Sequence, residues 1–411
     1  MTRLLPVKVR IFSLCLIWFL YLVILDKIYL DHNATTPMAP EVLELVTSVL
    51  QNQVGNPSSV HSAGRSARIL VDEAREQVAS FIGASPSEII FTSGGTEANN
   101  FALLGVALGL GKNRGHIVTS QVEHPSILNP CLQLEALGFE VDRLKVDSLG
   151  RVDGLEDSLT ESTLLVSLQH ANSETGVLQN IEKAGEIAGK RGVLFHTDAV
   201  QSVGKIPLQV KEIPVDMLSI SAHKLNGPKG VGALYLKNGS PDLFSPICGG
   251  GQEKKRRGGT ENVAGIVGFG KACELARLFS QEMAKFSSLR DHFLQLVSSQ
   301  ISGVEVYGDL ENRLPNTLNL GFEGVEGDTL LICLDMAGVA VSTGSACSSG
   351  TGLPSPVLTA MGIPTDKINS SIRFSFGKSN TIAEIEKVVE ILVRAVSTNR
   401  TGMNAERVIK T

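Results

Sequence analysis

The sequence predicts an α/β protein built around a mostly parallel sheet. Short apolar runs alternate with helix-like stretches from residue 28 onward, which is typical of parallel strands joined by helical crossovers. A chain of 411 residues with 43% hydrophobic residues is long enough for two or three domain-sized units with a large core. The ligand of a parallel sheet lies at the carboxyl ends of its strands, so residues that follow the apolar runs are the first functional candidates.

The expected elements follow from these runs in chain order. In the first unit the expected strands are 88–92, 116–119, 164–168, 193–195 and 217–220, with helices at 97–110 and 181–190. A single long helix over 264–286 is expected to lead into a second unit. There we expect helices at 289–299, 329–336 and 382–396 and strands at 304–306, 317–320 and around 372–374.

The first 27 residues differ in composition from the rest. Residues 11–25 are uncharged and apolar, follow a basic start and include Trp18, the only tryptophan. A helix of this length reaches about 22 Å against a hydrocarbon core of about 30 Å, and no small-residue cleavage site follows. A membrane anchor, a degraded signal and an inert extension stay open. Membrane contact is not favoured, because a strand is expected to begin only three residues later, at Ile28.

Charge and cysteine usage narrow the class of protein. There are 37 basic and 42 acidic residues and no long basic tract, so a nucleic acid is not the expected partner. The six cysteines show no CxxC and no paired Cys/His spacing. This argues against a zinc site or a disulfide framework and favours a reducing, cytoplasmic compartment. They are Cys15, Cys131, Cys248, Cys273, Cys333 and Cys347.

Two side chains have the setting of reactive groups. Cys347 lies in a run of serines, threonines and glycines over 342–352, which predicts an exposed, mobile loop whose thiol can react. The alternative is an inert buried thiol, the commoner state of cysteine. Lys224 follows the apolar run 215–220 and precedes a tight turn at 225–230. A lysine held at a strand end in this way can form a Schiff base.

Two further strand ends carry candidate ligand groups. Residues 92–97 read as strand, glycine turn and helix start, which directs backbone N–H groups and the Thr96 hydroxyl at one point, as in a phosphate site. Such turns more often only cap a helix. Asp198 follows the expected strand 193–195 and precedes Lys224 by one strand. A carboxylate there suits a protonated pyridine nitrogen, although a helix cap is the alternative.

This order of groups resembles the cysteine desulfurases of the NifS- and IscS-like group, class-V aminotransferases that bind pyridoxal 5'-phosphate on the aspartate aminotransferase fold, fold type I. The resemblance extends from residue 28 to about residue 396. It rests jointly on the motifs Leu30–Pro37, Gly55–Ser59, Thr92–Asn99, Glu123–Pro125, Asn172–Gly176, His196–Gln201, Ser221–Lys224, Arg257–Asn262, Gly344–Cys347 and Ile372–Ser375.

The resemblance implies a role for each matched residue. Lys224 would form the Schiff base with the cofactor and then move the proton on the substrate α-carbon, and His124 would stack on the ring and move protons. Cys347 would accept the sulfur. The remaining cofactor ligands would be Gly95, Thr96, Asn172, Asp198, Gln201, Ser221 and His223, with Thr260 reaching the phosphate from the other subunit of a homodimer; Asn172 and Arg373 would hold the substrate carboxylate.

The implied fold has a large cofactor-binding domain with a mostly parallel seven-stranded sheet over 41–275. A smaller α+β domain, formed by 28–40 and 276–400, carries the cysteine loop. Residues 1–27 would be an extension outside the fold and 401–411 a tail. One departure is the basic run Lys254–Arg257, which has more charge than is common in the family and puts the local subunit contact in doubt.

The implied activity converts L-cysteine to L-alanine and leaves a persulfide on Cys347, which passes sulfur to an acceptor such as an iron–sulfur scaffold protein. Two alternatives remain open. A selenocysteine lyase would have the same fold and cofactor and release selenide. A non-catalytic scaffold or interaction protein would retain a vestigial cofactor site.

Overall fold

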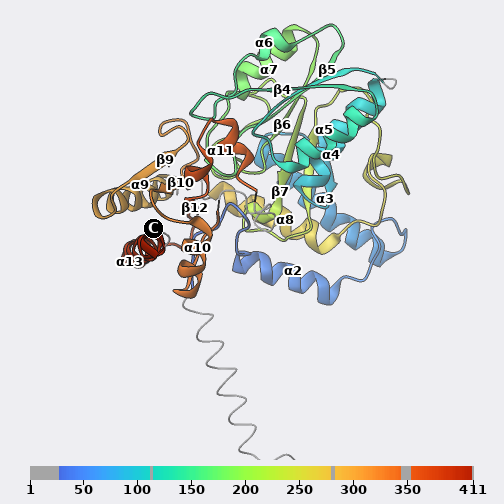
Figure 1. Ribbon diagram of the computed structural model, residues 1–411. Coiled ribbons are helices and arrows are strands. Elements are labelled where there is room, and N and C mark those ends of the chain that lie inside the picture. Colours follow the sequence, from blue (N-terminus) through green and yellow to red (C-terminus); the bar gives the residue numbers. More distant parts are fainter. Residues whose placement is uncertain (1–26, 112–113, 279–282, 344–352, 410–411) are drawn as a thin grey trace, which may run out of the picture.

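The computed structural model describes residues 27–111, 114–278, 283–343 and 353–409 of the chain. Within these residues the chain forms a large unit around a seven-stranded sheet and a smaller unit around a three-stranded sheet, side by side in Figure 1. The α/β class and the fold-type-I architecture predicted from the sequence are confirmed.

The large sheet has the strand order β2-β8-β7-β6-β5-β3-β4. Only β8 runs antiparallel to its neighbours, so the sheet is mostly parallel as predicted. The strands are β2 Ile89–Thr92, β3 His116–Ser120, β4 Glu140–Leu144, β5 Thr163–Gln169, β6 Leu194–Asp198, β7 Met217–Ser221 and β8 Gly232–Leu236.

Helices cover both faces of this sheet because its inner strands are apolar on both sides. Alternate residues of β2 lie in different cores, with Ile89 and Phe91 in one and Ile90 in the other. The first face packs against α3 (Ser62–Ile82), α7 (Ile181–Lys190) and α8 (Val263–Leu278), and the second against α4 (Gly95–Leu110) and α5 (Pro125–Ala136).

The smaller unit has its own core. The antiparallel sheet β12-β10-β9 packs against helices, and rings of Phe293, Phe374 and Phe376 meet in its centre. β1, near the start of the described chain, pairs with β11 of this unit. The elements are β1 Ile28–Tyr29, α9 Met283–Gln300, β9 Val304–Tyr307, β10 Thr317–Phe322, α10 Gly327–Met336, β11 Val339–Ala340, β12 Ser371–Ser375 and α13 Ile382–Ile409.

Shorter segments complete the chain. They are α2 Pro40–Asn52, α6 Leu155–Ser158, α11 Pro356–Ala360, α12 Thr365–Ile368 and the 3-10 turns η1 Pro86–Glu88, η2 Ala222–Lys224 and η3 Gln252–Lys255. The turn η2 matters most for function, because it carries Lys224 directly after β7.

Two helix predictions differ from the structure. The expected single helix 264–286 ends in the described chain at Leu278, and residues 283–286 belong to α9 together with the expected helix 289–299. The last helix continues past residue 396 to Ile409. Arg400 explains part of this extension, since its guanidinium donates to the carbonyl oxygens of Glu323 and Ser302 and so fixes a turn of weak helix formers.

Two of the four basic residues in the run Lys254–Arg257 form contacts inside the subunit. Arg257 forms an ion pair with Glu97 at the start of α4 (N–O distance 2.8 Å), and Arg256 donates to the carbonyl oxygen of Ser87. Buried Glu253, just before this run, binds Arg75 and the backbone N–H of Phe91. These contacts fix the segment against the end of the large sheet.

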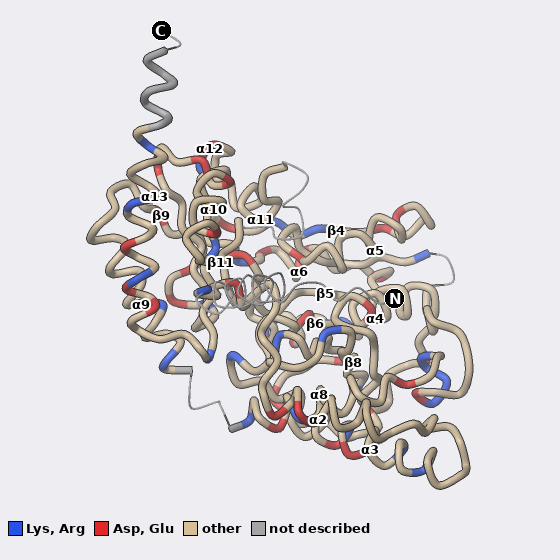
Figure 2. The backbone as a smooth tube through the Cα atoms, turned by 90° about the horizontal axis from the view of Figure 1, so that it is seen from below, with Lys and Arg blue, Asp and Glu red and all other residues tan. Residues whose placement is uncertain are grey.

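Charged residues of both signs are interspersed over the two units (Figure 2). Among the described residues, the helices are all too short or too polar to cross a bilayer. The apolar stretch 11–25 lies outside the described residues, so its predicted behaviour stays a prediction.

Candidate active site

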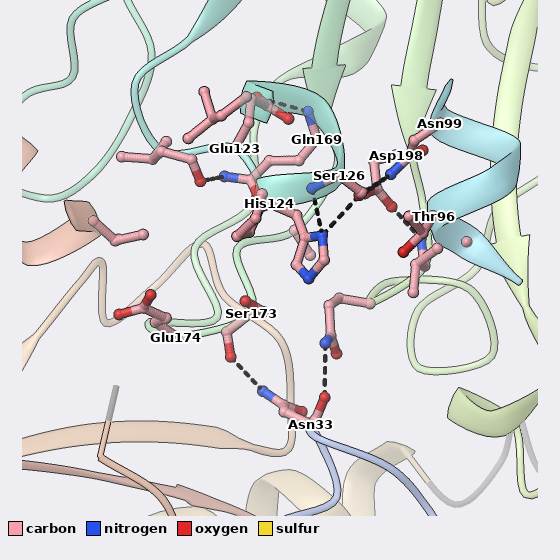
Figure 3. A pocket seen from close by; sticks show the side chains of 18 of the residues that line it. Asn33, Thr96, Asn99, Glu123, His124, Ser126, Gln169, Ser173, Glu174 and Asp198 are labelled. Carbon is pink, nitrogen blue, oxygen red and sulfur yellow. Dashed lines mark hydrogen bonds between the residues drawn. The ribbon is translucent and has the colours of Figure 1, made fainter. Parts of the chain in front are cut away.

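A cavity of about 580 Å³ lies at the carboxyl ends of the parallel strands, closed on one side by the smaller unit. Its walls come from the segments that follow β2, β3, β5, β6 and β7 and from β12 (Figure 3). Leu353 and Pro354, the first described residues after the segment with Cys347, also line it.

The cavity gathers nine of the twelve side chains selected from the sequence. Asn172 lies behind its wall, Thr260 lines a separate cavity of about 190 Å³, and Cys347 falls outside the described residues. Those that line it are Gly95, Thr96, His124, Asp198, Gln201, Ser221, His223, Lys224 and Arg373.

One end of the cavity has the features of an anion site. The turn before α4 uses Gly94 at φ 154°, and the first turn of this helix packs closely, since a Cβ on Gly95 would lie 2.7 Å from Val200 Cγ2. The helix start therefore presents backbone N–H groups to the cavity. Beside it, the hydroxyl oxygen of Ser221 is buried and has no hydrogen-bond partner among the described residues.

Lys224 enters the cavity from η2. Its Nζ donates to the carbonyl oxygens of Asn33 and of Ala34, the latter at 2.8 Å. Both acceptors lie on the segment that follows β1 of the smaller unit. The amine is thereby held against the junction of the two units.

A row of hydrogen bonds connects Asp198 to His124 along one wall (Figure 3). Asn99 Nδ2 donates to Asp198 Oδ2 at 2.7 Å and to Ser126 Oγ at 2.8 Å, and Ser126 Oγ lies 2.7 Å from His124 Nδ1. The second oxygen of Asp198 accepts from the backbone N–H of Val200. This carboxylate is thus fixed at the end of β6 with one face on the cavity.

The two cavity histidines favour the neutral form. Burial, with the nearby Lys224, lowers the pKa of His124 although Asp198 acts in the opposite direction. The His124 Nδ1 accepts the backbone N–H of Ser126, so the ring proton of the neutral form is on Nε2. Burial and the neighbouring lysines lower the pKa of His223 to about 4.

Arg373 brings a guanidinium from β12 to the cavity. It donates to Asp31 Oδ1 at 2.7 Å and to the Ser173 carbonyl oxygen at 3.1 Å, while its buried Nε has no hydrogen-bond partner in the part of the chain that the structure describes. Glu174 lies on the same side, where its carboxylate accepts from Ser355. Two of the five guanidinium N–H groups therefore orient Arg373, and among the described residues the other three have no acceptor.

Glu123 is an acidic cavity residue that the sequence analysis did not select. Its Oε1 accepts from Ser120 Oγ at 2.6 Å and from the backbone N–H of Gln169 at 3.0 Å, and no described residue donates to its buried Oε2. Burial raises the pKa of Glu123 to about 8, and nearby Asp198 adds to this. The carboxyl group is thus protonated at neutral pH.

Asn172 supports the wall instead of facing the cavity. Its Oδ1 accepts the backbone N–H groups of Glu174 and Thr175, and its Nδ2 donates to the Val122 carbonyl oxygen at 3.0 Å. Its predicted contact with a substrate carboxylate stays a prediction, as does the contribution of Thr260 from another subunit.

Besides Glu123, three further polar residues that organise the cavity were missed as individual residues: Asn33, Asn99 and Lys205. Asn33 and Asn99 lie inside motifs that were recognised, but their partners are far away in the sequence, so spacing gave no sign of them. Lys205 had a usable signal. It is a charged residue in the otherwise uncharged stretch Ser202–Pro207, where a buried lysine needs polar partners.

The cavity fits pyridoxal 5'-phosphate as a set of complementary groups. The unpartnered Ser221 hydroxyl at a helix start suits a phosphate, the Asp198 carboxylate suits a protonated ring nitrogen, and the Lys224 amine suits an aldehyde. A cavity of about 580 Å³ has room for a cofactor of this size together with an amino acid.

Comparisons with known proteins agree with this geometry. The cysteine desulfurase IscS of Dictyoglomus turgidum is 49% identical over 378 residues, which are 91% of this chain and 96% of that protein. A cysteine desulfurase of a Nostoc species is 48% identical over 376 residues, 90% of this chain and 93% of that protein.

Solved structures give the same result. A NifS-like protein superposes with a TM-score of 0.85 at 38% identity, covering 90% of this chain and all of the other (100%). A NifS-like protein from Rickettsia africae gives 0.82 at 36% identity with the same coverage, 90% and 100%. A structure described as SspA in complex with cysteine gives 0.76 at 35% identity, covering 85% of this chain and 99% of that one.

The aminotransferase class-V profile matches residues 28–388, and this span contains every described residue that lines the cavity. With this match and relatives of 48–49% identity over nine-tenths of the chain, the protein belongs to the class-V aminotransferase family and, within it, to the IscS- and NifS-like cysteine desulfurase group.

Proposed function

We propose that the protein is a pyridoxal-phosphate-dependent cysteine desulfurase that converts L-cysteine to L-alanine and passes the sulfur on for iron–sulfur cluster assembly. The observation that carries the proposal is the convergence of Lys224, Asp198, His124 and Arg373 on one cavity, beside an unpartnered Ser221 hydroxyl. The names of the relatives agree with this activity, and one similar protein was solved with cysteine bound.

The cofactor would be held at its phosphate by the start of α4, Ser221 and His223, and at its ring by Asp198, Gln201 and His124. When bound, it supplies an aldehyde for the substrate amine and a ring that takes up the electron pair left when the α-proton leaves. Lys224 would hold it covalently in the resting enzyme.

The chain's own groups would then move protons and orient the substrate. The Lys224 amine, once released, would take the proton from the substrate α-carbon, since its carbonyl partners Asn33 and Ala34 hold it in the cavity. Neutral His124 carries its proton on Nε2 and can give or receive one there. The N–H groups of Arg373 that are not used by Asp31 and Ser173 would bind the substrate carboxylate.

The sulfur step would belong to Cys347. Its thiolate attacks the substrate sulfur, so an S–S bond forms while the bond between the substrate Cβ and sulfur breaks. The electron pair of the broken bond stays with the substrate carbon, which takes up a proton and becomes the methyl group of L-alanine, while the two sulfur atoms form the persulfide, so no external oxidant is needed. The persulfide then passes to a sulfur acceptor such as a scaffold protein.

A homodimer would complete the phosphate site. Thr260 lies away from the main cavity in its own subunit, which is compatible with its predicted contribution to the cavity of a second subunit.

The test is formation of L-alanine and sulfide from L-cysteine by the holoenzyme, and by Lys224→Ala with Lys211→Ala as a matched control at an exposed lysine. We expect turnover in the native protein and the control and none in Lys224→Ala, which should also lose the covalent cofactor. L-Selenocysteine is assayed in parallel. A native protein that acts on it and leaves L-cysteine untouched would contradict the proposal and identify a selenocysteine lyase.

A further inference from the structure

A second lysine, Lys205, is buried just outside the cavity. It is 7% exposed and is not among the residues that line the cavity. Its Nζ donates to Gln201 Oε1 at 3.0 Å and to Asn33 Oδ1 at 2.9 Å. A lysine is seldom buried without a carboxylate partner, yet both of these acceptors are neutral amide oxygens.

The first contact orients the side-chain amide of Gln201. Gln201 Nε2 donates to the Asn33 carbonyl oxygen at 2.9 Å, and a carbonyl oxygen can only accept, so the amide oxygen faces Lys205. Lys205 thus donates to the buried Gln201 Oε1, which would otherwise have no hydrogen-bond donor among the described residues. The donor end of Gln201, with its second N–H, is held on the side of Asn33 and the cavity.

The second contact fixes Asn33, whose carbonyl oxygen also accepts from Lys224 Nζ. Asn33 is 1% exposed, and its Nδ2 donates to the Ser173 carbonyl oxygen and to Thr317 Oγ1. Asn33 therefore accepts a hydrogen bond from Lys205 at its side-chain oxygen and hydrogen bonds from both Lys224 and Gln201 at its backbone carbonyl oxygen. The three side chains form one connected network.

We propose that Lys205 is a positioning residue of the cofactor site, which acts through Gln201 and Asn33 to present the amide donor of Gln201 and the amine of Lys224 to the bound cofactor. This inference rests on the proposed function. It assigns no proton transfer or substrate contact to Lys205.

The surroundings of Lys205 disfavour its charged form. Burial lowers its pKa well below the usual range, and the cations Lys224 and Arg373 lower it further. His223 and His32 also face it, and the pKa of each is lowered to about 4, so both are neutral. The two amide oxygens need one N–H donor each, and a lysine amine has at least two hydrogens in either charge state.

The test follows the visible absorption of bound pyridoxal phosphate as a function of pH. Gln201 resembles the family residue that binds the phenolic oxygen of the cofactor, so in the proposed site its free N–H would donate to that oxygen. Loss of that donor raises the proton affinity of the oxygen. The midpoint pH of the absorption titration should therefore rise by about one pH unit in Lys205→Met and in Gln201→Leu. Lys211→Met, at an exposed lysine, should keep the native midpoint.

The double variant distinguishes positioning from an independent effect. If Lys205 acts through Gln201, the midpoint of Lys205→Met with Gln201→Leu should equal that of Gln201→Leu alone. Additive shifts, or a native midpoint in either single variant, would overturn the proposal. So would a Lys205→Met protein that fails to fold, measured by its melting temperature, because this would indicate a purely structural role.

The same spectra separate this inference from the proposed function. If Lys224→Ala has the native spectrum, the covalent role of Lys224 is wrong whatever Lys205 does. If Lys224→Ala loses the native spectrum but Lys205→Met keeps the native midpoint, the positioning role of Lys205 is wrong and the covalent role of Lys224 stands.

Discussion

Burial, more than pairing, sets the charge states of the cavity residues. His124 and His223 are neutral because a buried imidazolium is poorly solvated, and Glu123 retains its proton for the corresponding reason. The fixed carboxylate is Asp198, which has hydrogen-bond donors on both oxygens. One cavity therefore contains a protonated carboxyl group (Glu123), neutral imidazoles (His124 and His223) and a carboxylate (Asp198), and differences in solvation and hydrogen bonding keep them in these forms.

The protonated state of Glu123 should make stability depend on pH. Its pKa rises from 4.5 to about 8 on folding, so the folded protein binds the extra proton in this window. The stability that this proton contributes is complete below about pH 4.5 and is lost as the pH rises towards 8, by roughly 1.4 kcal/mol per pH unit.

The neutral variant Glu123→Gln should lack this contribution. We expect its free energy of unfolding, measured with urea at pH 5, 6.5 and 8, to fall less steeply with pH than that of the native protein. Equal pH dependence of the two proteins would show that Glu123 is ionised in the fold.

The start of α4 is the element that shapes the expected phosphate site. Its close approach to the segment after β6 depends on the absence of a side chain at Gly95, beside Val200. Helix and strand ends can then converge on one point together with Ser221.

Gly95→Ala should therefore weaken cofactor binding. The new methyl group would displace Val200 or the helix start, at a cost of about 1–3 kcal/mol, and we expect the dissociation constant of pyridoxal phosphate to rise at least tenfold, measured by absorption titration. The control is Gly189→Ala in α7, where an added Cβ meets nothing within 4 Å. Unchanged affinity in Gly95→Ala would remove α4 from the phosphate site.

Sequence patterns predicted those helices and strands whose own residues show an amphipathic or apolar pattern. The strands β2, β3, β5 and β7 were predicted to within a few residues because they are short and buried on both faces. The extension of α13 was not, because Asn399 and Arg400 are held by distant partners, Glu326 and Glu323.

The same limit applies to the candidate site. Residues in local motifs, such as Lys224 after β7, could be selected because the motif itself carries the chemistry. The network of Lys205, Gln201 and Asn33 could not be derived from spacing, since Asn33 is 168 positions from Gln201 in the chain.

At the scale of the molecule, the cavity depends on both units. Arg373 comes from β12, while Lys224 and Asp198 come from the large sheet. The smaller unit also includes β1, since Ile28 and Leu30 lie in its core and Lys27 approaches Asp335 of α10. Contacts of the described chain thus begin at residue 27.

Removal of residues 1–26 should therefore leave folding and catalysis intact. We expect native melting temperature and turnover, whereas removal of residues 1–30 should lower the melting temperature by taking Ile28 and Leu30 out of the core. A folded but inactive 27–411 protein would contradict the account. Emission of Trp18 with added liposomes tests the stretch 11–25 separately, and a blue shift with co-sedimentation would indicate a membrane anchor.

The central claim is that sulfur leaves L-cysteine for Cys347, and mass spectrometry of the holoenzyme tests it most directly. After exposure to L-cysteine under non-reducing conditions, the peptide that contains Cys347 should gain one sulfur atom while L-alanine forms. Cys347→Ser should still bind the cofactor and L-cysteine but give no added sulfur and almost no L-alanine. Native rates of L-alanine formation by Cys347→Ser would contradict the account.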